Sequence, residues 1–157
     1  MVWSINPDAQ WHALKLAASF FFALPAGFIG EKETHSAGLR TFPLVAMASC
    51  GYLLLAQPEG HAAPDVQSRI VQGLLAGIGF IGGGAIVKTE NQVHGVATAA
   101  GIFSTGVVGA AIAEDRWFMA FVLSLITCLG MRYLVPLKAR IGREGPPAPP
   151  KTENPID

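Results

Sequence analysis

Apolar residues along this chain gather in five long runs that are almost free of charge, with polar residues and prolines between them. A bilayer core of about 30 Å is crossed by roughly 20 residues of α-helix. Each run approaches that length, so the pattern predicts an all-α membrane protein with about five transmembrane helices. The runs are 11–30, 41–57, 70–87, 95–113 and 117–136.

The runs differ in the side chains that they carry. The first holds a single charge, Lys15, near one end, from where we expect its ammonium group to reach the membrane surface. The run 95–113 consists almost wholly of small residues, which favour close helix packing, so we expect it near the bundle centre. The bulky run 117–136 has Trp117 and Tyr133 near its ends, a pattern typical of a helix that faces lipid.

Lysine and arginine residues in the connections predict the orientation, because they are retained on the cytoplasmic side. Those assigned to that side are Lys32, Arg40, Lys88, Lys138, Arg140, Arg143 and Lys151. The opposite side holds Arg116, with Arg69 at a boundary. Five spans then place the N-terminus outside and the C-terminus in the cytoplasm; a four-span or hairpin alternative would break this bias. We expect residues 1–137 to form the membrane domain and the charged, proline-rich residues 138–157 a flexible cytoplasmic tail.

Composition agrees with a membrane protein. Hydrophobic residues make up 51% of the chain and charged residues 14%, against roughly 25% charged in soluble proteins. The formal net charge is zero and no basic block recurs, which argues against nucleic acid as a partner. Cys50 and Cys128 lie in separate apolar runs, which predicts small core side chains rather than a disulfide or a metal site.

Glycines are concentrated in the third run. Gly77, Gly79 and Gly82 match the G-x-G-x-x-G pattern of dinucleotide sites, but they interrupt an apolar run and lack the carboxylate that this motif requires downstream. We favour close approach of another helix, since glycines four apart share one face; a kink with freed carbonyl groups is the alternative. The residues assigned to packing or a kink are Gly73, Gly77, Gly79, Gly82, Gly83, Gly84 and Gly95.

Polar residues at the borders of these runs form a second candidate site. Asp65 and Arg69 are four apart, so on a helix they share a face and can form an ion pair. Such residues are either ordinary interfacial charges or a polar cluster that binds an ion or a partner. The candidate cluster comprises Glu31, Arg40, Thr41, Asp65, Arg69, Gln72 and Thr98, and no metal is assigned to it.

Taken in order, the motifs of the chain resemble those of the MgtC/SapB family over roughly residues 11 to 135. The motifs are Gly27-Phe-Ile-Gly30-Glu31, Ala37-Gly38-Leu39-Arg40-Thr41, Asp65-Val-Gln-Ser-Arg69-Ile70, Gly77-Ile-Gly79-Phe80-Ile-Gly82-Gly83-Gly84 and Val93-His94-Gly95-Val-Ala-Thr98-Ala99-Ala100. Each is weak alone, but the combination is specific. Lys32 stands where the family commonly has arginine, which weakens a bidentate contact to a point charge. The likeness is to short, membrane-only members.

The resemblance implies a bacterial inner-membrane protein connected with magnesium limitation, ion homeostasis and, in some pathogens, virulence. One interpretation is a regulator that binds another membrane complex, such as ATP synthase, through small-residue faces like that of 95–113. The alternative is a small transporter or channel for magnesium or another cation, with ligands from Glu31, Asp65, Gln72 and carbonyl groups around 82–84.

An enzyme is not expected, because no nucleophile, base and carboxylate fall together in the sequence. No cofactor is predicted, although an association with Mg²⁺ is left open. The expected partners are the lipid bilayer, a second copy of the chain in a homodimer and another membrane protein complex.

Overall fold

The computed structural model describes residues 7–34, 38–56, 64–89 and 92–134 of the chain. Five helices form the protein: α1 (Pro7–Thr34), α2 (Thr41–Leu55), α3 (Pro64–Gly84), α4 (Val96–Ala113) and α5 (Trp117–Leu129). A π-helical turn, η2 (Gly130–Leu134), extends α5. The prediction of an all-α protein with five helices is confirmed, while the tail 138–157 lies outside the described residues.

The helix bounds differ from the apolar runs at both ends of the third run. Helix α3 begins at Pro64, six residues before the run, since proline is well suited to the first position of a helix. It ends at Gly84, and a short antiparallel ribbon follows, β1 (Val87–Thr89) and β2 (Gln92–His94), with Val87 opposite His94. This ribbon was not predicted from the sequence.

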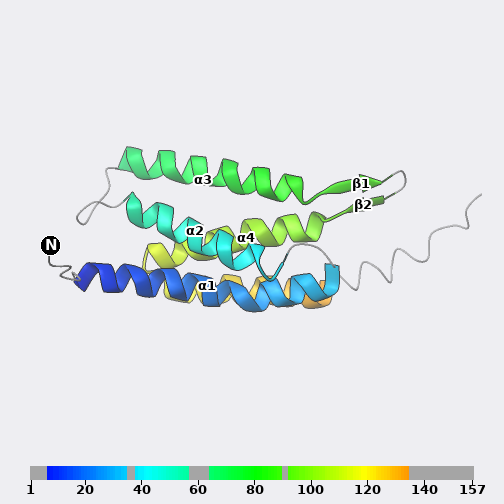
Figure 1. The fold of residues 1–157 in the computed structure, drawn as a ribbon, viewed down its shortest axis with the longest axis horizontal. Helices are drawn as coiled ribbons and strands as arrows, with labels where there is room; N and C mark the ends of the chain where they lie inside the picture. Colours follow the sequence, from blue (N-terminus) through cyan, green and yellow to red (C-terminus); the bar gives the residue numbers. More distant parts are fainter. Residues whose placement is uncertain (1–6, 35–37, 57–63, 90–91, 135–157) are drawn as a thin grey trace, which may run out of the picture.

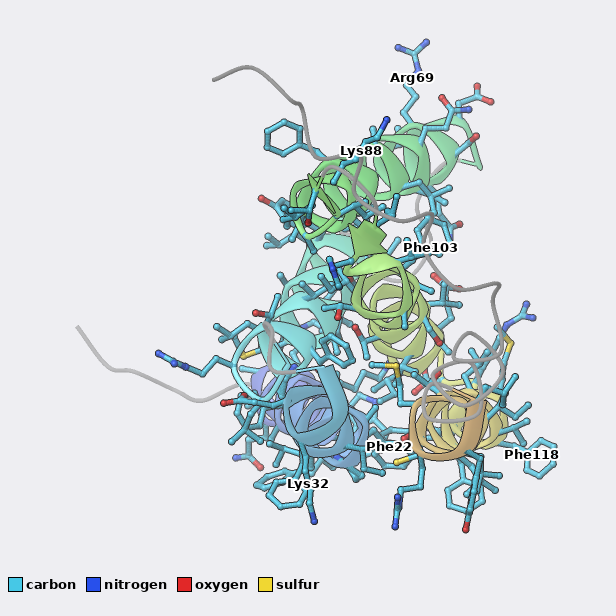
Figure 2. All side chains as sticks on the ribbon, turned by 90° about the vertical axis from the view of Figure 1, so that its right-hand side faces the viewer. Phe22, Lys32, Arg69, Lys88, Phe103 and Phe118 are labelled. Carbon is cyan, nitrogen blue, oxygen red and sulfur yellow. The ribbon has the colours of Figure 1, made fainter. Side chains whose placement is uncertain are left out.

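The helices lie side by side and alternate in direction, so the bundle has two ends (Figure 1). The N-terminal end holds the start of α1, and the hairpin end is the one from which β1 and β2 project. Seen along this axis, α1 and α5 form one edge, α2 and α4 the middle and α3 the opposite edge (Figure 2). Helix α3 packs on α4 and α2.

Helix α4 lies at the centre because its small residues let its neighbours approach closely. A Cβ atom on Gly101 would lie 2.5 Å from the ring of Phe42, and one on Gly109 would collide with the backbone of Ala46. Helices α2 and α4 are thus in near-direct backbone contact, the kind of packing that glycine and alanine permit between membrane helices. The central position expected for this run is confirmed.

Three segments are long and apolar enough to cross a membrane: Ala9–Lys32 of α1, Val96–Ala113 and Trp117–Leu134. Helix α2 is apolar but has 15 residues. Within the described residues, α3 is not among the segments that are long and apolar enough to cross a membrane. A membrane protein with several spans is supported, and the five-span topology with the N-terminus outside stays a prediction.

Candidate functional site

Four of the five sequence motifs meet at the hairpin end. The end of α1, the start of α2, the end of α3 and the start of α4 all lie there (Figure 1). Residues 27–31, 38–41, 82–84 and 95–100, far apart in the sequence, are therefore gathered at one end of the bundle. The motif Asp65–Ile70 lies toward the other end.

The turn into α2 is fixed against α1 by two contacts. A Cβ atom on Gly38 would lie 2.6 Å from the carbonyl oxygen of Gly27, so the two backbones touch. The backbone N–H of Leu39 donates a hydrogen bond of 2.8 Å to Oε2 of Glu31. Glu31, predicted as an ion or partner ligand, thus helps to hold the start of α2.

Apolar side chains fill the interior beside these motifs. Phe42 is fully buried and its ring packs against Gly101 and near Gly30, where Met131 closes the same space. Thr98, the polar candidate on α4, is 0% exposed. The centre of the hairpin end is therefore packed core.

The triple glycine forms the last turn of α3. The helix ends at Gly84, and just after it the N–H of Ala85 donates to the carbonyl of Gly82 and that of Ile86 to the carbonyl of Gly83, both at 3.1 Å. These carbonyl groups are thus hydrogen-bonded within the chain. After the ribbon, Gly95 has φ of 83° and lies against the carbonyl of Ala85, so its conformation and the contact both require glycine.

The predicted polar cluster is divided between the two ends. Glu31, Arg40, Thr41 and Thr98 lie at the hairpin end, whereas Asp65 and Arg69 lie in the first turns of α3, at the N-terminal end. Among the described residues, Asp65 and Arg69 form no ion pair with each other, and both are exposed. Arg69 points away from the bundle (Figure 2). Gln72 follows one turn later on α3 and is exposed as well.

The glycines of α3 separate into two groups. A Cβ atom on Gly82 would lie 3.4 Å from the carbonyl oxygen of Ala99, so this glycine packs on α4. A Cβ atom on each of the other five would meet no atom within 4 Å: Gly73, Gly77, Gly79, Gly83 and Gly84. Their predicted role in helix packing therefore needs a partner outside this bundle, and it stays a prediction.

Lys15 forms a site that was not predicted from the sequence. Its side chain is 4% exposed rather than at the surface. Nζ donates to the carbonyl oxygen of Ala113 at 3.0 Å and to Oδ2 of Asp115 at 2.8 Å, and it lies 6.0 Å from the centre of the Trp11 ring. The ammonium group lies inside the protein near the turn between α4 and α5, because the carbonyl end of α4 attracts a cation and supplies a partner there. Its expected position at the membrane surface stays a prediction.

A second polar contact lies beside this site. Nε2 of Gln67 on α3 donates to Oε1 of Glu114 at 2.7 Å. It ties the start of α3 to the turn between α4 and α5. A lone charge in an apolar run marked Lys15 as unusual, but its partners lie about a hundred residues away and no local pattern identifies them.

A groove of about 510 Å³ opens between α2 and α3. Its walls are mainly apolar, and Tyr52 on its α2 side is 60% exposed. The lining residues are Val45, Ala48, Ser49, Tyr52, Ile70, Gly73, Leu74, Gly77, Ile78 and Ile81. Gly73 and Gly77, whose Cβ positions meet no atom within the chain, thus line this groove.

Comparison with known proteins supports the resemblance seen in the motifs. Residues 16–140 match the MgtC family. The chain belongs to the MgtC family. No solved structure matches it.

Relatives of this MgtC-family protein come from several bacteria. SrpB of Synechococcus elongatus is 34% identical over 137 residues, which cover 78% of this chain and 75% of SrpB. SapB of Bacillus subtilis is 26% identical over 147 residues, 89% of this chain and 62% of SapB. YhiD of Escherichia coli, provisionally named a magnesium transporter, is 29% identical over 129 residues, 76% of this chain and 60% of YhiD. The chain spans less than two thirds of the latter two proteins.

Magnesium in proteins is held mainly by oxygen ligands, often carboxylates. Within the described residues, no group of three or more His, Cys, Asp or Glu side chains could hold a metal ion. The carboxylates whose side chains are described lie near helix ends: Glu31, Asp65, Glu114 and Asp115. The described part of the bundle interior therefore offers packing surfaces rather than a ligand cage.

Proposed function

We propose that this MgtC-family protein is a multi-pass protein of a bacterial inner membrane that acts in magnesium or ion homeostasis by binding another membrane protein. The observation that carries this proposal is the one-sided attachment of α3. Helix α3 packs on α2 and α4 while five of its glycines have no neighbour within 4 Å of a Cβ position.

The groove between α2 and α3 supports this role. Its volume of about 510 Å³ can take large apolar side chains from a transmembrane helix. Gly73 and Gly77 form part of its wall, so the backbone of a partner helix can come close at this place. Tyr52, exposed at the same groove, supplies a hydroxyl group for a hydrogen bond to the partner.

The positions of the candidate ion ligands also favour binding over conduction. Glu31 and Asp65 lie at opposite ends of the bundle, and the carbonyl groups of Gly82 and Gly83 accept backbone hydrogen bonds. The centre between these ends contains the tight contact of α2 with α4. A single copy thus presents no continuous set of oxygen ligands from end to end among the described residues.

A cation transporter is the second candidate. The name of YhiD favours it. A path through this small bundle would require several copies, because the interior of one copy is filled by α4 and its neighbours.

The orientation belongs to the same proposal. Among the described residues, the hairpin end carries Lys32, Arg40, Lys88 and Arg132, whereas the N-terminal end exposes Arg69 and Arg116. Because positive charge is retained in the cytoplasm, this distribution supports a cytoplasmic position for the hairpin end.

Two experiments test the regulatory role against transport. A photo-crosslinking residue in place of Tyr52 should join the protein to another membrane protein in native membranes. The same residue in place of Tyr133, which is similarly exposed on η2, should give far less of this product. Purified protein in liposomes should pass Mg²⁺ no faster than empty vesicles; a flux that Asp65→Asn abolishes would instead establish a transporter.

A further inference from the structure

The N-terminal half of α3 is bordered by cavities on two sides. The groove of about 510 Å³ separates it from α2, and a second pocket of about 240 Å³ lies between α3, α4 and the start of α5. Gln67 and Val71 of α3 line this second pocket, opposite Ala110, Glu114 and Met119. The first half of α3 is therefore loosely packed against the bundle.

The other half of α3 is held on α4 by close contacts. Among the residues of α3 whose side chains are described, Ile78 and Gly82 are the buried ones. A Cβ atom on Gly106 of α4 would collide with the end of the Ile78 side chain, and one on Gly82 would lie 3.4 Å from the carbonyl oxygen of Ala99. The fixed part of α3 thus lies toward the hairpin end.

A polar contact holds the loosely packed half of α3 onto the bundle. Nε2 of Gln67, in the first turn of α3, donates a hydrogen bond of 2.7 Å to Oε1 of Glu114, just after α4. Helix α5 also buries few side chains, but Ser124 and Thr127 tie its middle to α1 and α4 through hydrogen bonds. In α3 the contact lies at the end farthest from Gly82, and we call the pair Gln67 and Glu114 the latch.

The last turn of α3 has the properties of a hinge. Cβ atoms on Gly83 and Gly84 would meet no atom within 4 Å, and glycine leaves the backbone free to rotate. Hinges are commonly a few residues at the end of an element. At about 1.5 Å per residue, Arg69 lies about 21 Å from Gly83 along the helix and Phe80 about 5 Å, so a rotation here moves the latch end most.

We propose that α3 is a hinged wall of the groove, which pivots at Gly83 and Gly84 and is held closed by the latch. When the hydrogen bond of the latch breaks, the first half of α3 moves away from α4 and the groove between α2 and α3 widens. The movement then regulates access of the partner to the groove, a consequence that rests on the proposed function. The movement itself requires this chain alone.

Distances between spin labels on the purified full-length chain test the movement. In a Cys50→Ala, Cys128→Ala background, labels at Ala17→Cys on α1 and Arg69→Cys on α3 measure the separation of the two edges of the bundle (Figure 2). Gln67→Leu should increase the population of the longer distance about fivefold, because it removes the hydrogen bond of the latch.

Two controls separate a hinge from a general loosening of α3. Gln72→Leu makes the same substitution at an exposed position of the same helix and should leave the distance unchanged. With the α3 label at Phe80→Cys in place of Arg69→Cys, the shift caused by Gln67→Leu should be about a fifth as large, because Phe80 lies close to the pivot.

Exchange of the two latch residues separates the hydrogen bond from a packing defect. Gln67→Glu sets two carboxylates against each other and should open α3 further. With Glu114→Gln added, the amide at 114 donates to the carboxylate at 67, and the closed distance should return. In the Gln67→Leu background, Gly83→Ala with Gly84→Ala should suppress the opening, since alanine stiffens the pivot, whereas Gly79→Ala should not.

The outcomes distinguish the hinge from the proposed function. An unchanged distance in Gln67→Leu, equal shifts for labels at 69 and 80, or an exchanged pair that stays open would overturn the hinged wall. Gln67→Leu should also raise the yield of photo-crosslinking from Tyr52, and a yield that does not respond would overturn the regulation. A shifted distance with no crosslink from Tyr52 in any variant would refute the partner while supporting the hinge.

Discussion

The Nζ atom of Lys15 lies 3.0 Å from the carbonyl oxygen of Ala113, in the last turn of α4. The final carbonyl groups of a helix lack partners within the helix and carry partial negative charge. The lysine supplies a hydrogen bond and a positive charge at the point where α4 ends and the chain turns into α5. A charge inside a membrane helix is thereby compensated by a helix end.

Lys15→Met should lower the free energy of unfolding by about 2 kcal/mol, because a buried charged hydrogen bond is lost while the apolar volume is kept. Thermal unfolding in detergent, followed by circular dichroism, measures this loss. Asp115→Asn is the control: the Asp115 side chain is 58% exposed, so its ion pair contributes about 0.5 kcal/mol. Asparagine also accepts the positive φ of 58° at this position. Equal losses in the two variants would assign the stabilisation to the ion pair instead.

Gly109→Ala should destabilise the protein by about 3 kcal/mol, since the added methyl group collides with the backbone of Ala46 and forces α2 from α4. The methyl group added by Gly77→Ala would meet no atom of the chain. This substitution should leave the free energy of unfolding unchanged or raise it by up to about 1 kcal/mol, because alanine favours the helix more than glycine does. Unfolding in mixed micelles compares the two variants. Similar stability would show that α2 and α4 are not in close contact.

Glu31→Ala should increase hydrogen exchange at the amide of Leu39 by about tenfold, because that N–H loses its acceptor. Glu31→Gln keeps a side-chain oxygen at the same reach and should preserve most of the protection. Exchange followed by mass spectrometry provides the readout. Equal protection in wild type and Glu31→Ala would mean that the turn is held by the contact of Gly38 with Gly27 alone.

The hydroxyl groups of Ser104 and Thr127 lie 2.5 Å apart and join α4 to α5. Thr127 donates to the carbonyl of Leu123, so Ser104 is the donor of the shared hydrogen bond. A double-mutant cycle with Ser104→Ala and Thr127→Val should give a coupling of about 0.6 kcal/mol, the usual size within membranes. Additive single effects would argue against this bond.

The sequence predicted the helices well because length and low charge are sufficient signals for membrane segments. The central place of α4 followed from its small residues, since glycines such as Gly109 are useful only where another backbone comes close. The motifs also predicted the family. The ribbon at Val87–Thr89 was not predicted, because a strand of three residues has too little alternation of apolar and polar side chains to be distinguished from a loop.

The candidate site was harder to predict, because it depends on which helix ends meet. Glu31 and Asp65 both border apolar runs, and only the alternation of helix direction separates them by the length of the bundle. Lys15 was recognisable as a lone charge, but its position in the sequence does not reveal that α4 ends beside it. The glycines of α3 share a spacing in the sequence. Only the structure shows that Gly82 packs on α4 whereas the Cβ positions of the other five glycines meet no atom within 4 Å.

The shortness of α2 has a consequence for the membrane itself. At about 1.5 Å per residue, its 15 residues extend about 22 Å, while the 28 residues of α1 extend about 42 Å. A hydrocarbon layer of about 30 Å is too thick for the exposed side of α2, where Leu44 and Tyr52 face outward. If α2 crosses the membrane, as the five-span topology predicts, we expect the bilayer to thin beside this helix, at the mouth of the groove with α3. Membrane thickness would then be a physical variable to which this protein is mechanically coupled.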